Sequence, residues 1–230
     1  MAIHWGGRGP GHCGRYTPAS AVAAPSAPAP AIISSTAWVY NSGSGNLAVP
    51  DVQSGDLLLL AVGTFYTEAI STPSGFTARN VVTGNGPRLS LFERESDGTE
   101  TEIAYSDSGS WQMLQLYVIR GCTRPGGSAI HKVGSNQAQA AGDGTYTLPG
   151  FTTEMGNCLI MGMTEQHNGS FDGGAWSHPD ISVTKLTTRV QGDQVYHHAH
   201  GVKEAAGLVG SMTGHLSANF WFAGFQAAIR

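Results

Sequence analysis

Short apolar runs alternate with glycine-rich turns along the chain, and the clearest pattern of this kind occurs twice. A glycine followed by an acidic or amide residue opens an apolar run at 55–65 (GDLLLLAVGTF), and the same order returns at 156–166 (GNCLIMGMTEQ). Each run is followed by a proline-led segment, which starts at Pro73 and at Pro179, and then by a polar strand, a glycine turn and an aromatic-rich last strand. The preserved order predicts two copies of one supersecondary unit.

The spacing of apolar positions predicts strands throughout and almost no helix. Runs with a period of two, bounded by Gly, Pro, Asn, Asp and Ser, are typical of β-strands. The expected strands lie near 32–40, 56–65, 75–83, 88–95, 101–106, 111–120, 129–134, 145–149, 157–166, 181–190, 195–203 and 216–229. Within this series, 57–60 is apolar at every position, which is typical of a central strand covered on both faces. By contrast, 88–95 mixes polar and apolar residues and predicts an edge or interface strand.

These patterns predict one antiparallel β-sandwich or jelly roll made from two divergent repeats. A half of about 70 residues with one apolar face is marginally stable alone and is buried well by packing against a partner. We therefore expect a single domain at 32–230, with repeat halves at roughly 32–121 and 129–230.

The first 31 residues have a different composition and predict an extended N-terminal arm. Residues 1–16 are rich in Gly, His and Arg, whereas 17–31 (TPASAVAAPSAPAPA) favour extended polyproline geometry. We expect the arm to dock on a neighbouring molecule and to order there. Its expected partner-binding residues are Trp5, Arg8, Arg15 and Tyr16. A tail that stays disordered is the alternative interpretation.

Composition narrows the classes of function. Only 12% of the 230 residues are charged and 32 are glycine, so small polar residues must make up much of the surface. Lys and Glu are depleted in interface cores, so their scarcity favours self-association, although a neutral monomer remains the alternative.

The net charge of -4 argues against nucleic-acid binding. No apolar run is long enough for a membrane span, and the N-terminus lacks the apolar stretch of a secretory signal, so we expect synthesis in the cytoplasm. The odd number of cysteines without CxxC spacing predicts reduced thiols, with Cys122 and Cys158 as small buried hydrophobes.

The histidines are the strongest candidates for chemistry. Within 196–201 (YHHAHG), His198 and His200 are two residues apart, so on a strand they share one face, as in a two-histidine metal clamp. Together with Gly192 and Glu204 they fit the first sequence signature of the cupins, which have a β jelly roll, and His215 with Asn219 resembles the end of the second. The separation between the signatures is too short, and the proline and glycines of the second are missing. A cluster of solvated or interface histidines without a metal or other cofactor is the preferred interpretation, and His198, His200 and Glu204 stay as metal candidates.

Two other groups of residues have chemical potential. The carboxylates Glu93 with Glu95, and Glu100 with Glu102, each share a strand face and would suit a glycosidase, but more often such residues pair with arginines across strands. Aromatic residues spread over the last strands favour core packing. Trp176 lies in a glycine-rich loop next to His167, so this loop is the expected contact if a glycan binds.

The strings GDLLLLAVGTF from Gly55, PSGFTARN from Pro73, RLSLFERESDGTE from Arg88 and SWQMLQLYVIRG from Ser110 resemble a duplicated β-sandwich of tailed-bacteriophage virion proteins. The likeness covers 32–230, and its matching positions are structural. It implies a head decoration (cement) protein, a head spike or fibre, or a tail-associated protein, and it brings no catalytic residue.

The resulting prediction is a non-enzymatic virion protein, most simply a homotrimeric decoration protein that binds the major capsid protein on the outside of the phage head. Its arm would link neighbouring capsomers. The alternatives are a receptor-binding or carbohydrate-binding module of a head spike or tail fibre, whose partner is a host-surface glycan, and a cupin-like metal-dependent enzyme. No nucleic acid, membrane or cofactor is expected.

Overall fold

The computed structural model describes residues 27–65, 68–83, 86–124, 127–141, 144–167, 175–191, 194–215 and 220–230. Within these ranges the chain is built from β-strands, as predicted. No helix there is long and apolar enough to cross a membrane.

The strands of the first half agree closely with the expected series. They are β1 (Ala31–Ser35), β2 (Val39–Asn41), β3 (Gly45–Ala48), β4 (Leu57–Thr64), β5 (Thr77–Thr83), β6 (Arg88–Glu95), β7 (Glu102–Tyr105) and β8 (Gln112–Arg120). The short strand β3 falls outside the expected strand ranges, and its residues Gly45 to Ala48 pair with β7.

The second half contains more short strands than expected. They are β9 (Ile130–Val133), β10 (Gln137–Ala141), β11 (Thr145–Leu148), β12 (Phe151–Thr153), β13 (Cys158–His167), β14 (Trp176–Ser177), β15 (Thr184–Gln191), β16 (Gln194–Lys203), β17 (Gly207–Val209), β18 (Met212–His215) and β19 (Phe220–Ile229). The unexpected strands β10, β12, β14, β17 and β18 have two to five residues, too few for a periodic pattern to stand out.

Two large sheets dominate the described strands, and all of the pairings in them are antiparallel. The first large sheet has the order β1-β8-β4-β6-β5, with β2 also paired to β8. The second large sheet has the order β10-β19-β13-β16-β15, with β9 also paired to β19. The repeated apolar runs therefore form the middle strands, β4 and β13, of sheets with the same order of parts.

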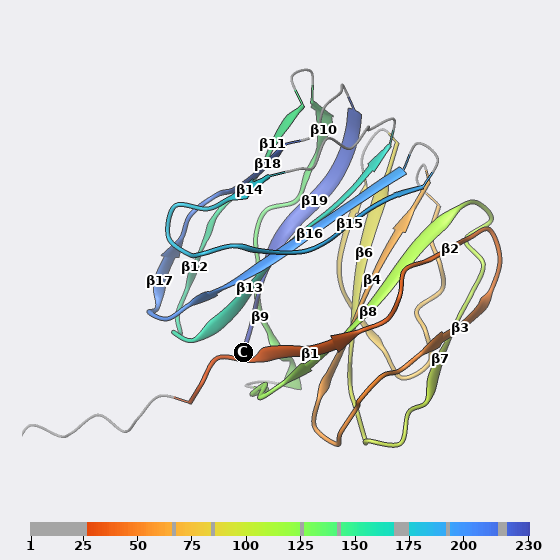
Figure 1. The fold of residues 1–230 in the computed structure, drawn as a ribbon, viewed down its shortest axis with the longest axis horizontal. Coiled ribbons are helices and arrows are strands. Elements are labelled where there is room, and N and C mark those ends of the chain that lie inside the picture. The colour runs from red at the N-terminus through yellow and green to blue at the C-terminus, as the bar shows by residue number, and fades with distance from the viewer. Residues whose placement is uncertain are drawn as a thin grey trace, which may run out of the picture.

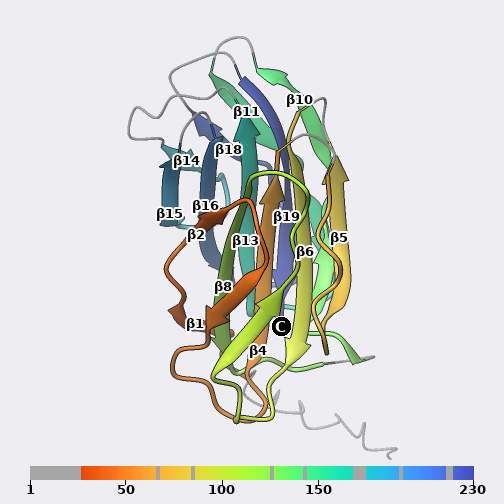
Figure 2. The same cartoon turned by 90° about the vertical axis from the view of Figure 1, so that its right-hand side faces the viewer.

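The sheets lie in layers, with the two large sheets inside and the small sheets outside (Figures 1 and 2). A central core of residues from both large sheets, including Leu59, Leu91, Met161 and Phe225, fills the space between them. A second core joins the second large sheet to the small sheets β11-β18-β14 and β12-β17. A third joins the first large sheet to the small sheet β3-β7.

The middle strand β4 is covered on both faces, as its sequence predicts. Leu57 and Leu59 point into the central core, whereas Leu58 and Leu60 point into the third core. All eight residues of β4 are buried. A continuous apolar strand is stable here because both of its faces are removed from water.

The expected edge position of β6 is wrong. β6 pairs with β4 on one side and β5 on the other, so it lies inside the sheet. Its polar residues are tolerated because they find partners: the buried Glu93 accepts a 2.7 Å hydrogen bond from Nε of Arg79. The polar content of this strand therefore does not predict its position in the sheet.

Each apolar run follows a residue with a positive φ. In the first half this residue is Gly55, with a φ of 87°, a region that favours glycine. Asp56 then accepts hydrogen bonds from the backbone of Gln53 at 2.8 Å and from Nε of Arg120 at 2.9 Å. In the second half it is Asn157, with a φ of 53°, which aligns with Asp56 rather than with Gly55. The repeated motif thus serves to start a strand.

Candidate functional site

β16 distributes its histidines between two cores. Side chains alternate across a strand, so His197 points into the second core and His198 into the central core. His197 contacts Tyr146 and Trp176, with ring centroids 6.1 and 4.5 Å away. Both histidines are fully buried. The cluster that the sequence presents as one group is therefore divided between opposite faces of one strand.

His198 belongs to a polar network inside the central core. Its Nδ1 lies 2.7 Å from the hydroxyl oxygen of Tyr117, and that hydroxyl donates to Oε1 of Gln115 at 2.7 Å. The hydroxyl proton is then committed to Gln115, so Nδ1 of His198 carries the proton that it donates to Tyr117. Burial, together with the nearby His197, lowers the pKa of His198 to about 3. The imidazole is neutral at physiological pH and serves the packing of the two sheets.

The segment between β1 and β2 covers this network. Trp38 contacts the ring of Tyr196 at 4.4 Å and that of His198 at 5.4 Å between centroids. The hydroxyl of Tyr196 donates to the carbonyl of Met113 across the sheets at 2.7 Å. Aromatic residues thus close the central core around His198.

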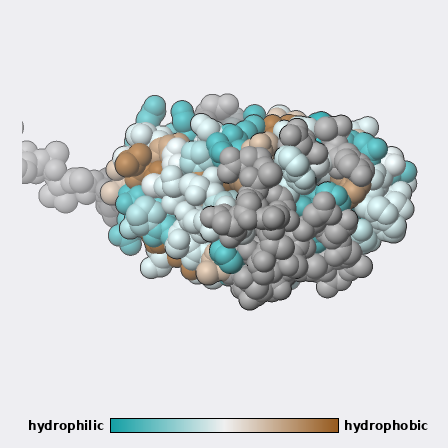
Figure 3. Space-filling model, turned by 90° about the horizontal axis from the view of Figure 1, so that it is seen from above, coloured by the Kyte–Doolittle hydropathy of each residue, from teal (hydrophilic) through white to brown (hydrophobic). Residues whose placement is uncertain are grey.

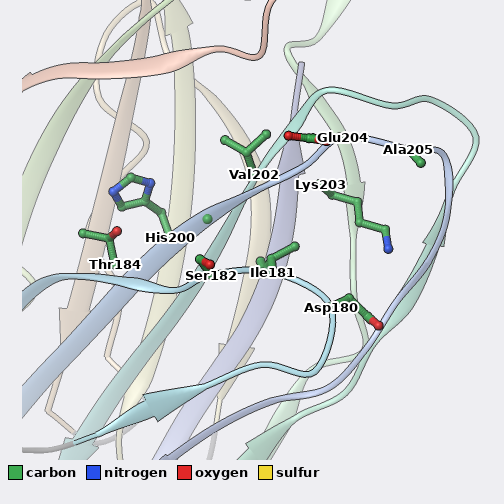
Figure 4. Close-up of a pocket in the computed structure, with 10 residues that line it drawn as sticks. Asp180, Ile181, Ser182, Thr184, His200, Val202, Lys203, Glu204 and Ala205 are labelled. Atoms are coloured by element: carbon green, nitrogen blue, oxygen red, sulfur yellow. The ribbon is translucent and has the colours of Figure 1, made fainter.

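His200 shares a face with His198, as the spacing predicts, but it lies beside an open groove, the His200 groove (Figure 4). This groove has a volume of about 600 Å³. It is lined by Asp180, Ile181, Ser182, Thr184, His200, Gly201, Val202, Lys203, Glu204 and Ala205. Nδ1 of His200 is buried and has no hydrogen-bond partner among the described atoms. Burial lowers the pKa of His200.

The groove exists because the chain before β15 crosses over a glycine in β16. A Cβ atom at Gly201 would lie 2.5 Å from the carbonyl oxygen of Ser182 and 3.0 Å from Cδ1 of Ile181. Only glycine lets the two segments approach so closely. The groove is bordered by the hydroxyl groups of Ser182 and Thr184, the imidazole of His200 and the charged ends of Lys203 and Glu204. Because these groups form hydrogen bonds, the groove suits a polar ligand rather than an apolar one.

The geometry does not bring the three proposed metal ligands together. His198 is bonded to Tyr117 in the central core, whereas His200 and Glu204 both line the His200 groove. Among the described residues, no three His, Cys, Asp or Glu side chains are placed to hold a metal ion. The structure therefore gives the metal hypothesis no support in this part of the chain.

The proposed glycan loop is only partly described, since 168–174 lie outside the described ranges. Trp176 is half-buried and packs on Tyr146 and His197 in the second core. His167 is largely buried at the end of β13, where its ring lies 4.2 Å from that of Phe65. In the described part of this loop, both residues contribute to packing.

An exposed aromatic pair occurs elsewhere. Trp111 is 47% exposed and stacks on Tyr40 with centroids 4.8 Å apart and planes 5° apart. Two aromatic residues of the last strands, Tyr117 in β8 and Phe225 in β19, are buried in the central core, as expected for these strands.

The paired carboxylates bind arginines. Glu93 contacts Arg79, Glu100 contacts Arg94 at 3.0 Å, and Glu95 contacts Arg124 at 3.4 Å. Burial raises the pKa of Glu100, but hydrogen bonds from Ser96 and the backbone outweigh it, and the pKa is lowered. Glu93, Glu95 and Glu100 are thus each paired with an arginine, as in the alternative interpretation.

The thiols are also structural. Cys158 is fully buried and Cys122 is partly buried, and neither forms a disulfide. Burial raises the pKa of the Cys122 thiol to about 12 and also raises the pKa of Cys158. Neither thiol is a reactive nucleophile at neutral pH. Cys13 lies outside the described residues.

The base of the arm is fixed on the body. The carbonyl of Ala27 accepts a 2.6 Å hydrogen bond from Nδ2 of Asn157, which belongs to the second half. The chain then enters the first half as β1. The residues expected to bind a partner, Trp5, Arg8, Arg15 and Tyr16, lie outside the described residues.

The described surface on one side of the molecule mixes residue types finely. Seen from above in Figure 3, hydrophilic and hydrophobic residues are interspersed, and many residues have intermediate hydropathy. This agrees with a chain in which only 12% of residues are charged.

Sequence reasoning missed the His200 groove and the partner of His198. The groove depends on Gly201 and on a crossing segment some twenty positions earlier, for which Pro179 and Asp180 were the available turn signal. Tyr117 and His198 are 81 positions apart, in different halves, so no local pattern joins them.

Comparison with known proteins gives no relative: no family model, curated protein or solved structure matches the chain.

Proposed function

We propose that the chain is a duplicated β-sandwich whose halves are diverged copies of one unit. The support is the order of parts. The apolar runs at β4 and β13 take the same middle position, and each is flanked by the last strand of its half and by the strand that follows the proline-led segment. Each large sheet buries one face against the other and one face against smaller sheets.

For function we propose a non-enzymatic structural protein of a virion, most simply a decoration or cement protein on the outside of a tailed-phage head. One observation carries this proposal. Ala27 is held on the layered β-body by Asn157, so an arm formed by residues 1–26 would begin at a defined point on the body. An arm on a closely packed β-body suits a protein that holds neighbours together.

The packing roles of the chemically capable residues also support this proposal. His197, His198, Tyr117, Glu93 and Glu100 all have partners inside the fold. A cement protein needs no such residue to be available, because it stabilises a shell by adding buried area across subunit boundaries. We propose the major capsid protein as its partner and a homotrimer as its assembly state.

The test is removal of residues 1–26, which leaves every described contact in place. We expect the truncated chain to occupy purified capsids less than the full chain does, and the shells to melt at a lower temperature. The full chain with Ala104→Arg, a substitution at an exposed position of β7, is the control for altered surface charge. Equal occupancy and equal shell stability for the truncated chain would refute the role of the arm.

The His200 groove favours one second candidate, a carbohydrate-binding module of a spike or fibre. Hydroxyl, imidazole and charged groups around an open hollow are the kinds of group that hydrogen-bond sugars. The test is a glycan array with the wild type, His200→Ala and Trp176→Ala. Loss of a signal with His200→Ala places the contact in the groove, loss only with Trp176→Ala returns it to the loop, and no wild-type signal removes this candidate.

A further inference from the structure

A second hollow lies at the open edge of the first half, between the first large sheet and the small sheet β3-β7. This edge groove has a volume of about 320 Å³. It is lined by Ser35, Thr36, Ala37, Val39, Asn46, Leu47, Ala48 and Pro50. None of these lining residues is charged, and Val39, Leu47 and Pro50 give it an apolar floor. It is therefore suited to small apolar side chains.

Two strands that border the edge groove, β1 and β3, each have a single strand partner among the described pairings. β1 bonds only to β8, and β3 bonds only to β7. The hydroxyl of Ser34 donates to the carbonyl of Pro50 at 3.0 Å and ties the two layers together at one end. An edge with unused backbone groups beside an apolar hollow is a general site for the addition of an extended peptide.

One segment of this chain matches the groove in chemistry. Residues 17–26 (TPASAVAAPS) contain no charged residue and consist mainly of alanine and proline. Between Pro18 and Pro25 they include six residues, ASAVAA, that all carry a backbone N–H, which an added strand needs. Val22 is the largest apolar side chain among these six and would be the anchor in the groove.

The position of Ala27 favours delivery from another molecule. Ala27 is held by Asn157 on the second half, and β1 then carries the chain towards Ser35 and the groove. To reach its own groove, the segment before Ala27 would have to reverse and run back along β1. No reversal is needed if the segment docks in the groove of a neighbouring molecule. Ten extended residues span about 31 Å, which is the reach available to it. A contact of this head-to-tail kind forms a ring where the rotation between neighbours closes, and an open filament where it does not.

We propose that the edge groove binds residues 17–26 of a second copy of this chain, with Val22 buried between β1, β2 and β3. This inference rests on the self-association included in the proposed function and names the surfaces that make it. Capsids are not needed for it, so the purified chain is sufficient for its test.

The test is cysteine cross-linking of two full-length chains in a Cys13→Ser background. One chain carries Ala21→Cys and the other carries Ala37→Cys, at an exposed position that lines the groove. Cys122 and Cys158 stay in place, because their raised pKa values keep them unreactive at neutral pH. We expect mild oxidation of the mixture to give a covalent dimer on a non-reducing gel. The matched control replaces Ala37→Cys by Ala104→Cys, which is also exposed but lies outside the groove, and should give no dimer.

Two results would overturn the proposal. The first uses a double variant that carries both Ala21→Cys and Ala37→Cys in one chain. If only this variant forms a cross-link, and it stays monomeric, the groove binds the arm of its own chain. If neither experiment forms a cross-link, the segment does not dock there.

Sedimentation gives an independent measurement. A charge placed in the groove by Ala37→Arg should weaken self-association by at least about tenfold, whereas Ala104→Arg should leave it unchanged. Equal association constants for the two variants would contradict the proposal, as would a wild-type chain that is monomeric. A positive result here with no capsid binding would remove the virion role and keep the arm contact.

Discussion

At the scale of single residues, the histidines show what sequence spacing can and cannot predict. The period of two places His198 and His200 on one face, and the structure confirms it. The same spacing does not reveal that one of them is buried against Tyr117 while the other borders a groove, because burial depends on strands from the other half. The sequence therefore predicts which histidines share a strand face, but it does not predict how each of them is surrounded.

The buried His198 makes stability depend on pH. Its folded pKa of about 3 lies below the ordinary value of 6.5, so the unfolded chain binds a proton that the folded chain does not. Stability should therefore fall as the pH drops from 6.5 towards 3, with a slope from this one group approaching 1.4 kcal/mol per pH unit, or about tenfold in the folding equilibrium. Urea unfolding of the wild type and His198→Gln between pH 7 and pH 4 measures this difference. The exposed His215→Gln should keep the wild-type slope, and a wild-type slope in His198→Gln would show that His198 is not the cause.

Gly63 is a residue whose side chain is excluded by a neighbour across the central core. A Cβ atom there would lie 1.8 Å from the hydroxyl oxygen of Tyr196. Gly63→Ala should lower the free energy of unfolding by about 1–3 kcal/mol, the usual cost of overpacking. Gly43→Ala is the control, because nothing lies within 4 Å of its Cβ position. Equal stabilities of the two variants, measured by chemical unfolding, would be inconsistent with this packing.

At the scale of elements, the long strands were predicted well and the short ones poorly. Long apolar runs form the strands β4, β8, β13 and β19. In a chain so rich in glycine, such runs are explained only by strands that are covered on both faces. Strands of two to five residues offer too few positions for a period to emerge. β6 was misplaced at an edge because its charged residues find arginine partners inside the structure. Side-chain pairing between distant strands is a tertiary property that a local pattern does not contain.

The turn before β4 is held to the end of β8 by an ion pair. Asp56 contacts Nη2 of Arg120 at 2.8 Å. Burial raises the pKa of Asp56, but the hydrogen bonds from Arg120 and Gln53 outweigh it and the pKa is lowered. Asp56→Ala removes these bonds from a buried position and should lower the melting temperature by about 2–6 °C. Glu95→Ala, whose carboxylate is 58% exposed, should change it much less. Scanning calorimetry of both variants measures the two melting temperatures. Equal decreases would mean that other contacts hold the turn.

At the scale of the whole molecule, the sequence predicted the all-β class, and the layers arose from tertiary packing. The repeated motif indicated sheets with one apolar face each, whereas both faces of the large sheets are covered. The additional covers are β3-β7 and the small sheets of the second half, which are made of the short strands that periodicity misses. The edge groove is lined partly by β3, one of these short strands. The His200 groove is instead lined by the chain around the start of β15 and the end of β16, whose close crossing the sequence did not reveal.

The central claim is that this chain is a structural component of a phage head. It is tested most directly by imaging purified particles in which the C-terminus of the chain carries a label, together with measurement of the copy number per particle. The account predicts many copies at regular, symmetry-related positions on the outside of the head. Absence of the chain from purified particles, or a label confined to the tail or scattered without symmetry, would contradict it.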